Sequence, residues 1–250
     1  MAEISVNENI CKNCNHTFTR HYCNECGQKK SHRITTAHLS HDLIHAIFHA
    51  DKGIFTYLKR LLYQPGVIAR EYIDGKRKIF NPIQFLVLSV GLLISVMFMV
   101  KFFDQLKLIQ NQSMKDNAPV ASAAQQAVSG FIQRNGNILQ LVLIPVFASF
   151  SGLIFRKKAN NYAEHLMLIV FAMSLSNILT ALAASIIYFA HLNLLVLISI
   201  TPVFTLTSFF LTYKQFYRSS IFEALWKAVI IYLLGFCVFI SLTVLLLKLL

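Results

Sequence analysis

Long apolar runs occupy the chain after residue 80. Residues 82–103 form a run of 22 positions with a single charge, Lys101, close to its end. A helix of this length measures about 33 Å and can cross a hydrocarbon core of about 30 Å. Similar runs follow at 138–155, 162–190, 192–213 and 221–247. The sequence therefore predicts an all-α polytopic membrane protein with about five transmembrane helices.

The charged residues are distributed unevenly along the chain. They make up 14% of the 250 residues and hydrophobic residues 56%, whereas soluble domains have about 25% and 45–50%. Residues 1–79 hold 12 of the 23 Lys and Arg and 7 of the 11 Asp and Glu. A bilayer explains this division, because a side chain that faces lipid cannot be hydrated. The composition excludes a soluble enzyme, a fibrous protein and a disordered chain.

Basic residues beside the apolar runs predict the topology. Three clusters fall on one side of the membrane: Lys76, Arg77 and Lys78; Arg156, Lys157 and Lys158; Lys214 and Arg218. The 104–137 loop, the turn at His191 and the C-terminus fall on the other. The first 30 residues contain no signal-peptide core. We therefore expect a membrane protein with a cytoplasmic N-terminus and an outside C-terminus. Topology explains most of the +12 net charge, which disfavours nucleic-acid binding.

Four of the five cysteines lie close together near the N-terminus. They form two Cys-x2-Cys pairs that are eight residues apart: Cys11, Cys14, Cys23 and Cys26. An oxidising compartment would favour disulfides, but the cytosol keeps thiols reduced and favours a tetrahedral zinc site. Asn15 and Gly27 follow the two pairs, and both tolerate the left-handed backbone of a zinc-knuckle turn. The spacing predicts a cytosolic four-Cys zinc ribbon in residues 1–32.

The predicted Zn(II) is structural rather than catalytic. Four cysteines close the coordination shell, whereas a catalytic zinc keeps one position open for water. A segment of about 20 residues cannot bury a core of its own, so metal binding supplies its folding free energy. His16 and His21 lie inside the loop as substitute ligands, but four cysteines make them unnecessary. The fifth cysteine, Cys237, is expected to pack within the last apolar run.

Residues 33–79 are expected to form amphipathic juxtamembrane helices. One helix face would carry four imidazoles opposite an apolar face: His38, His41, His45 and His49. This stripe is either a metal or pH-sensitive site, or a solvated surface that happens to be rich in histidine. Asp51 can cap a second helix, and Pro65 opens a third helix that ends at Asp74-Gly75.

Three cations stand directly before the first apolar run. Lys76, Arg77 and Lys78 follow helices that have one apolar face, and such helices lie on a bilayer or under a helix bundle. We expect the three cations to contact anionic headgroups of the lipid bilayer. The alternative is that they act only as a topology signal during insertion.

Several short motifs recur in one order along the chain. The two cysteine pairs are followed by Arg33-Ile34-Thr35, Asp51-Lys52-Gly53, Pro65-Gly66, Tyr72-x2-Gly75-Lys76-Arg77 and Pro82. This order, over about residues 10–85, resembles a bacterial membrane-protein family known only as a domain of unknown function, family 3667. Tyr162-x-Glu164-His165 is similar to that family too. The resemblance implies a zinc-ribbon head on a multi-span bundle in the bacterial inner membrane. It carries no known activity, and no catalytic residues can be transferred from it.

Small and weakly polar residues share one face of the third apolar run. They are Ser174, Asn177, Ala181 and Ser185, at spacings of three and four. Such a face allows helices to pack closely and to form hydrogen bonds with one another. A transport pathway would use the same face, but no Asp, Glu, Lys or Arg lies in the middle of any run. Helix packing is the favoured interpretation.

Three functional classes follow, and residues 80–250 would form the five-span bundle in each. The leading hypothesis is a non-enzymatic membrane protein whose zinc ribbon docks a cytosolic protein partner or organises the bundle. The second is a permease or channel for a small or lipidic solute, regulated by the ribbon. The third is a lipid enzyme at the membrane surface that uses Glu164 and His165 with the His-rich helix. A cavity that reaches Asn177 would favour transport.

Overall fold

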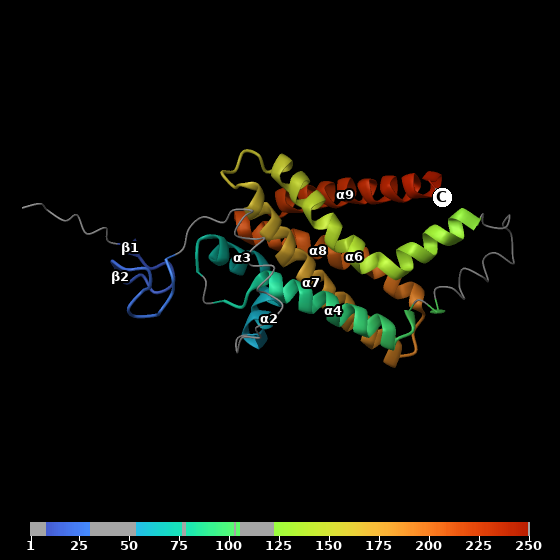
Figure 1. Ribbon diagram of the computed structural model, residues 1–250, viewed down its shortest axis with the longest axis horizontal. Helices are drawn as coiled ribbons and strands as arrows, with labels where there is room; N and C mark the ends of the chain where they lie inside the picture. The colour runs from blue at the N-terminus through green and yellow to red at the C-terminus, as the bar shows by residue number, and fades with distance from the viewer. Residues whose placement is uncertain (1–8, 31–53, 77–78, 103, 106–122, 250) are drawn as a thin grey trace, which may run out of the picture.

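The computed structural model describes residues 9–30, 54–76, 79–102, 104–105 and 123–249 (Figure 1). Its strands are β1 (Asn9–Ile10) and β2 (Thr17–Phe18), which form an antiparallel pair with Asn9 opposite Phe18. Its helices are α2 (Ile54–Tyr63), α3 (Pro65–Ile73), α4 (Pro82–Met99), α6 (Ala123–Ile154), α7 (Tyr162–Phe189), α8 (Leu194–Tyr217) and α9 (Ile221–Leu249). The described part is mostly helical, as predicted.

Four helices are long and apolar enough to cross a membrane. They are α4, α7, α8 and α9, by length and composition within the described residues. In α6 the apolar segment is shorter, Leu139–Ile154, so the expected count of about five spans is supported for four. Helix α6 also begins at Ala123, inside the expected 104–137 loop. The residues before Leu139 therefore belong to the helix but not to its apolar segment.

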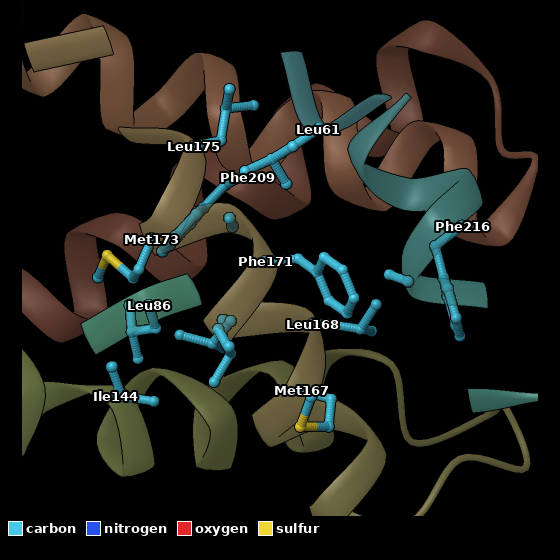
Figure 2. Packing of buried hydrophobic residues seen from close by; sticks show 14 of the residues in the cluster. Leu61, Leu86, Ile144, Met167, Leu168, Phe171, Met173, Leu175, Phe209 and Phe216 are labelled. Atoms are coloured by element: carbon cyan, nitrogen blue, oxygen red, sulfur yellow. The ribbon is translucent and has the colours of Figure 1, made fainter. Parts of the chain in front are cut away.

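Helix α7 is the centre of the bundle. In the most apolar segment of α7, 78% of the residues are buried, whereas in that of α9 only 17% are buried. Figure 2 shows side chains of α7, among them Leu168 and Phe171, within a cluster that also contains Leu86 of α4, Ile144 of α6 and Phe209 of α8. Consequently α7 is largely enclosed by protein, and α9 leaves most of its surface for lipid.

The long helices alternate in direction, so their loops collect at two ends (Figure 1). Phe155, just after α6, stacks on Tyr217 at the end of α8, with ring centroids 4.3 Å apart. The ammonium of Lys227, near the start of α9, lies 4.4 Å from the Phe155 ring centroid. The 156–158 loop and Lys214 therefore lie at the same end of the bundle as α2 and α3. This is the end to which the charge pattern assigns the basic clusters.

Helix α3 is clamped onto the last turns of α8 at that end. The backbone N–H of Gly66 donates to the side-chain oxygen of Gln215 (3.0 Å), and the Gln215 amide donates to the Tyr63 carbonyl (2.9 Å). The Arg70 guanidinium donates to the carbonyls of Gln215 and Phe216. A cation at a helix C-terminus satisfies carbonyls that have no partner within the helix. We call these contacts the α3–α8 clamp.

Candidate metal centre

The four predicted ligand cysteines come together in the head, which we define as residues 9–30. The Sγ atoms of Cys11 and Cys26 are 3.5 Å apart, as are those of Cys14 and Cys23, and all four lie within 4.8 Å of one another. A tetrahedral ion with metal–sulfur bonds of about 2.3 Å separates its sulfurs by about 3.8 Å. The cluster can therefore hold one metal ion such as zinc.

The two cysteine pairs lie on two backbone turns of the same type. The Cys11 N–H donates to the His16 carbonyl and the Asn15 N–H to the Cys11 carbonyl, both at 2.9 Å. The equivalent bonds in the second turn join Cys23 with Gln28 and Gly27 with Cys23, at 2.9 and 2.8 Å. Asn15 and Gly27 have φ angles of 61° and 67°. The expectation that these two residues adopt the left-handed conformation is confirmed.

The closeness of the four thiols opposes their joint ionisation. The backbone amide of Gln28 lowers the pKa of Cys26 to about 6. The backbone amide of His16 also lowers the pKa of Cys14. Desolvation and hydrogen bonds to the other thiols outweigh this effect and raise the pKa of Cys14 to about 12. Thiolates this close repel one another, and a divalent cation removes that penalty. The donor set fits a thiolate-binding metal.

Gln28, in the second turn, links the head to the turn after α3. The side-chain amide of Gln28 donates to the Gly75 carbonyl at 2.8 Å, and Gln28 is buried. Gly75 lies just after α3 with a φ of 105°, so that helix ends where the sequence predicts. The backbone of Gln28 belongs to the cysteine turn, as described above. The turn that surrounds the metal site therefore also positions the contact with the bundle.

The predicted headgroup cations are only partly described. Lys76 forms ion pairs with Glu71, with 3.3 Å between the ammonium and the carboxylate oxygen. Glu71 also pairs with Arg60 at 2.9 Å. Arg77, Lys78 and the stripe of His38, His41, His45 and His49 lie outside the described residues, as does Asp51. Lipid contact by the three cations and metal binding by the stripe stay predictions.

The polar face of α7 is used in helix packing. Asn177 is 1% exposed, accepts a hydrogen bond from the Gln140 amide at 2.7 Å and donates one to Ser89 at 3.3 Å. These bonds tie α7 to α6 and α4. Beside this face, Ser176 forms a bond of 3.0 Å with Thr205 of α8. Neighbouring helices therefore cover Asn177 on this face, as expected if the face serves helix packing.

Glu164 and His165 lie at the start of α7 with different roles. Glu164 forms a capping box with Asn161: its side chain accepts from the Asn161 N–H, and the Glu164 N–H donates back to the Asn161 side chain. His165 is 2% exposed, and its Nδ1 is 2.9 Å from the hydroxyl oxygen of Ser151, which is fully buried. Sequence reasoning missed Ser151, because no local pattern in α6 indicates its partner. A closed Ser–His pair offers a substrate no access.

Comparison with known proteins gives one match. Residues 51–94 match the family model described as "Protein of unknown function (DUF3667)". The matched segment includes α2, α3 and the first part of α4, and does not extend to the cysteines. No curated protein and no solved structure matches the chain. The match supports the predicted resemblance within the juxtamembrane segment and assigns no activity.

Proposed function

We propose that this chain is a non-enzymatic protein of the bacterial inner membrane whose cytosolic head is folded around one structural Zn(II) and docks a protein partner. The observation that supports this proposal is the cluster of four cysteine sulfurs, whose second turn is hydrogen-bonded through Gln28 to the turn after α3. Four thiolates complete a tetrahedral shell and leave no position for a substrate. The proposal includes α6 as a fifth span, a cytoplasmic N-terminus and an outside C-terminus.

Two alternatives are less well supported by the packing. A permease would need a path along α7, and the amide of Asn177 is already bound to two neighbouring helices. A surface lipid enzyme would need access to His165, which is buried beside Ser151. Docking of a partner protein needs only the head, its metal and an exposed surface. It is therefore the proposal that the described contacts support best.

Metal content is the first test. We expect about one zinc per chain after purification without chelator, and a large loss of zinc in Cys11→Ser/Cys26→Ser protein. The matched control is Cys237→Ser. Cys237, expected to pack within the last apolar run, is instead exposed, and it is remote from the cluster in sequence. Zinc below about half an equivalent in the parent, with four thiols titrating as free, would contradict the metal assignment.

Partner binding is the second test. The tagged full chain, purified from cells in mild detergent, should retain a soluble protein in near-stoichiometric amount, and the Cys11→Ser/Cys26→Ser variant should lose it. Cys237→Ser protein should retain it. A bound lipid or solute without any protein would instead support the permease or lipid-enzyme alternative.

A further inference from the structure

The head contains a groove on one side of the cysteine cluster. Its volume is about 330 Å³. It is lined by residues 9–12, Phe18 of β2 and residues 28–30. Pockets that hold small ligands or side chains start at about 300 Å³. Phe18 is buried against Cys11 and Cys23, so the metal site supports one wall of the groove. We call this feature the head groove.

The charged residues among the described lining of the head groove are all lysines. Lys12, Lys29 and Lys30 line it and are exposed, and no Asp or Glu is among its described lining residues. The basic clusters at 156–158 and at Lys214 and Arg218 lie at the ends of long helices, where topology accounts for them. These three lysines belong to no span, because they lie before residue 31. They therefore need another explanation.

Exposed apolar side chains accompany these lysines. Ile10, in the wall of the head groove, is 63% exposed, and Tyr22 is 57% exposed. The exposed apolar residues of the long helices can be covered by lipid. The head, in contrast, projects beyond α3 from the end of the bundle (Figure 1). Hydrocarbon around the long helices would therefore not cover it. A protein segment is the occupant that could cover Ile10 there.

We infer that the head groove binds an acidic, extended segment of the partner protein. The inference rests on the proposed docking function and names the surface and the chemistry of the partner. Lysine ammonium groups would pair with carboxylates of the segment. In an extended chain successive side chains point to opposite faces, so acidic residues can meet the lysines while apolar residues between them meet Ile10 and Phe18.

A direct binding experiment tests this inference. Full-length protein in nanodiscs of neutral lipid is titrated against a fluorescent (Glu-Val)5 peptide, with (Lys-Val)5 as the opposite-charge peptide, and anisotropy is measured. We expect saturable binding of the acidic peptide only, weakened by salt. Lys12→Gln/Lys29→Gln/Lys30→Gln protein should bind it roughly tenfold more weakly, as expected for the loss of three exposed ion pairs. Ile10→Ala should weaken binding independently of salt.

A charge-matched variant controls for net charge. Lys59→Gln/Arg156→Gln/Lys157→Gln also removes three exposed cations and should bind the peptide as the parent does. Zinc content, measured in every sample, shows that the head is folded. Equal peptide affinity in the parent and in the zinc-loaded head-groove variant would overturn the inference. So would a variant whose only defect is weaker binding to vesicles that contain phosphatidylglycerol, because the groove would then be a headgroup site.

The inference and the docking function can fail separately. If the parent retains a protein partner and the head-groove variant retains it equally, the docking function stands and the groove assignment is wrong. If the parent retains no protein and neither peptide binds, both are wrong. If the variant loses both the partner and the acidic peptide while its zinc stays bound, both are supported.

Discussion

At the scale of single residues, Gly66 decides how closely α3 approaches α8. A Cβ at this position would collide with the backbone oxygen of Thr212 and the backbone nitrogen of Phe216. Gly66→Ala must therefore separate the two helices and weaken the α3–α8 clamp. Overpacking of this kind costs about 1–3 kcal/mol. We expect a lower midpoint of thermal unfolding for the variant in detergent.

Gly91→Ala is the matched control for Gly66→Ala. Gly91 lies within α4, and a Cβ there would meet nothing within 4 Å. Alanine is the better helix former, so we expect no loss of stability. Equal midpoints for both variants would show that the close approach at Gly66 does not limit packing.

Glu71 should make the stability of the juxtamembrane helices depend on pH. Burial alone would raise the pKa of Glu71, but the hydrogen bond and charge of Arg60, and then Lys76, lower it overall. A carboxyl whose pKa is lower in the folded state stabilises the protein above its unfolded pKa of about 4.3, and this contribution is lost as pH falls through the folded pKa.

The comparison of the parent with Glu71→Gln isolates this contribution. The parent should be more stable near neutral pH, and its advantage should shrink as the pH is lowered below about 4. Any acid-induced loss of metal affects both proteins alike, so the difference between their unfolding midpoints is the quantity to follow. A pH-independent difference would mean that Glu71 acts through packing and not through its charge.

At the scale of helices, hydrogen bonds between side chains join α7 to its neighbours. Asn177→Ala removes the bonds to the Gln140 amide and the Ser89 hydroxyl. These two groups lose a hydrogen-bond partner at positions that are partly buried and buried. Interhelical bonds in membranes are worth about 0.6 kcal/mol on average. We expect a small but measurable loss of thermal stability in detergent. Ser185→Ala is the control, because the Ser185 hydroxyl bonds only the Ala181 carbonyl of its own helix among the contacts described.

The link between α3 and α4 allows a test of headgroup binding. Lys76 already pairs with Glu71, so reversing only Arg77 and Lys78 to Glu leaves that ion pair intact. If the two cations bind anionic headgroups, correctly inserted variant protein should retain less phosphatidylglycerol and gain less stability from it, at about 1 kcal/mol per cation. Retention equal to that of the parent would leave only the insertion signal.

Local chemistry explains which elements could be predicted from the sequence. Asn81 caps α4 by accepting hydrogen bonds from the N–H groups of Ile83 and Gln84, and Pro82 follows in the first turn. Pro65 opens α3 in the same way. In each case the relevant contacts lie within a few residues, so the residue type determines the result. The cysteine turns are predictable for the same reason.

Contacts between distant segments could not be predicted in this way. Gly66 meets Gln215 across 149 positions and Gln28 meets Gly75 across 47. A glycine or glutamine in these places carries no local signal of its partner. The start of α6 was missed for a different reason: its first turns lack the apolar periodicity on which the span assignment depended. Periodicity identifies the apolar part of a helix and misses its polar extension.

At the scale of the whole molecule, the two ends of the bundle differ in charge, and topology can be tested on that basis. A reporter that is active only in the cytoplasm should work at the N-terminus and at Lys157, and fail within residues 104–122 and after Leu250. Activity of the C-terminal fusion would mean that one helix does not cross the membrane. Helix α6 would then be the first candidate, because its apolar segment is the shortest.

The enclosure of α7 has a consequence for biosynthesis. When α7 leaves the ribosome, Ser89 and Gln140 have already been made, so Asn177 can find both of its partners at once. Ser176 must wait for Thr205, which is translated later. A nascent chain that ends after α7 would therefore leave the Ser176 hydroxyl without its α8 partner until α8 arrives. Slow translation between the two helices should prolong the need for an insertion chaperone.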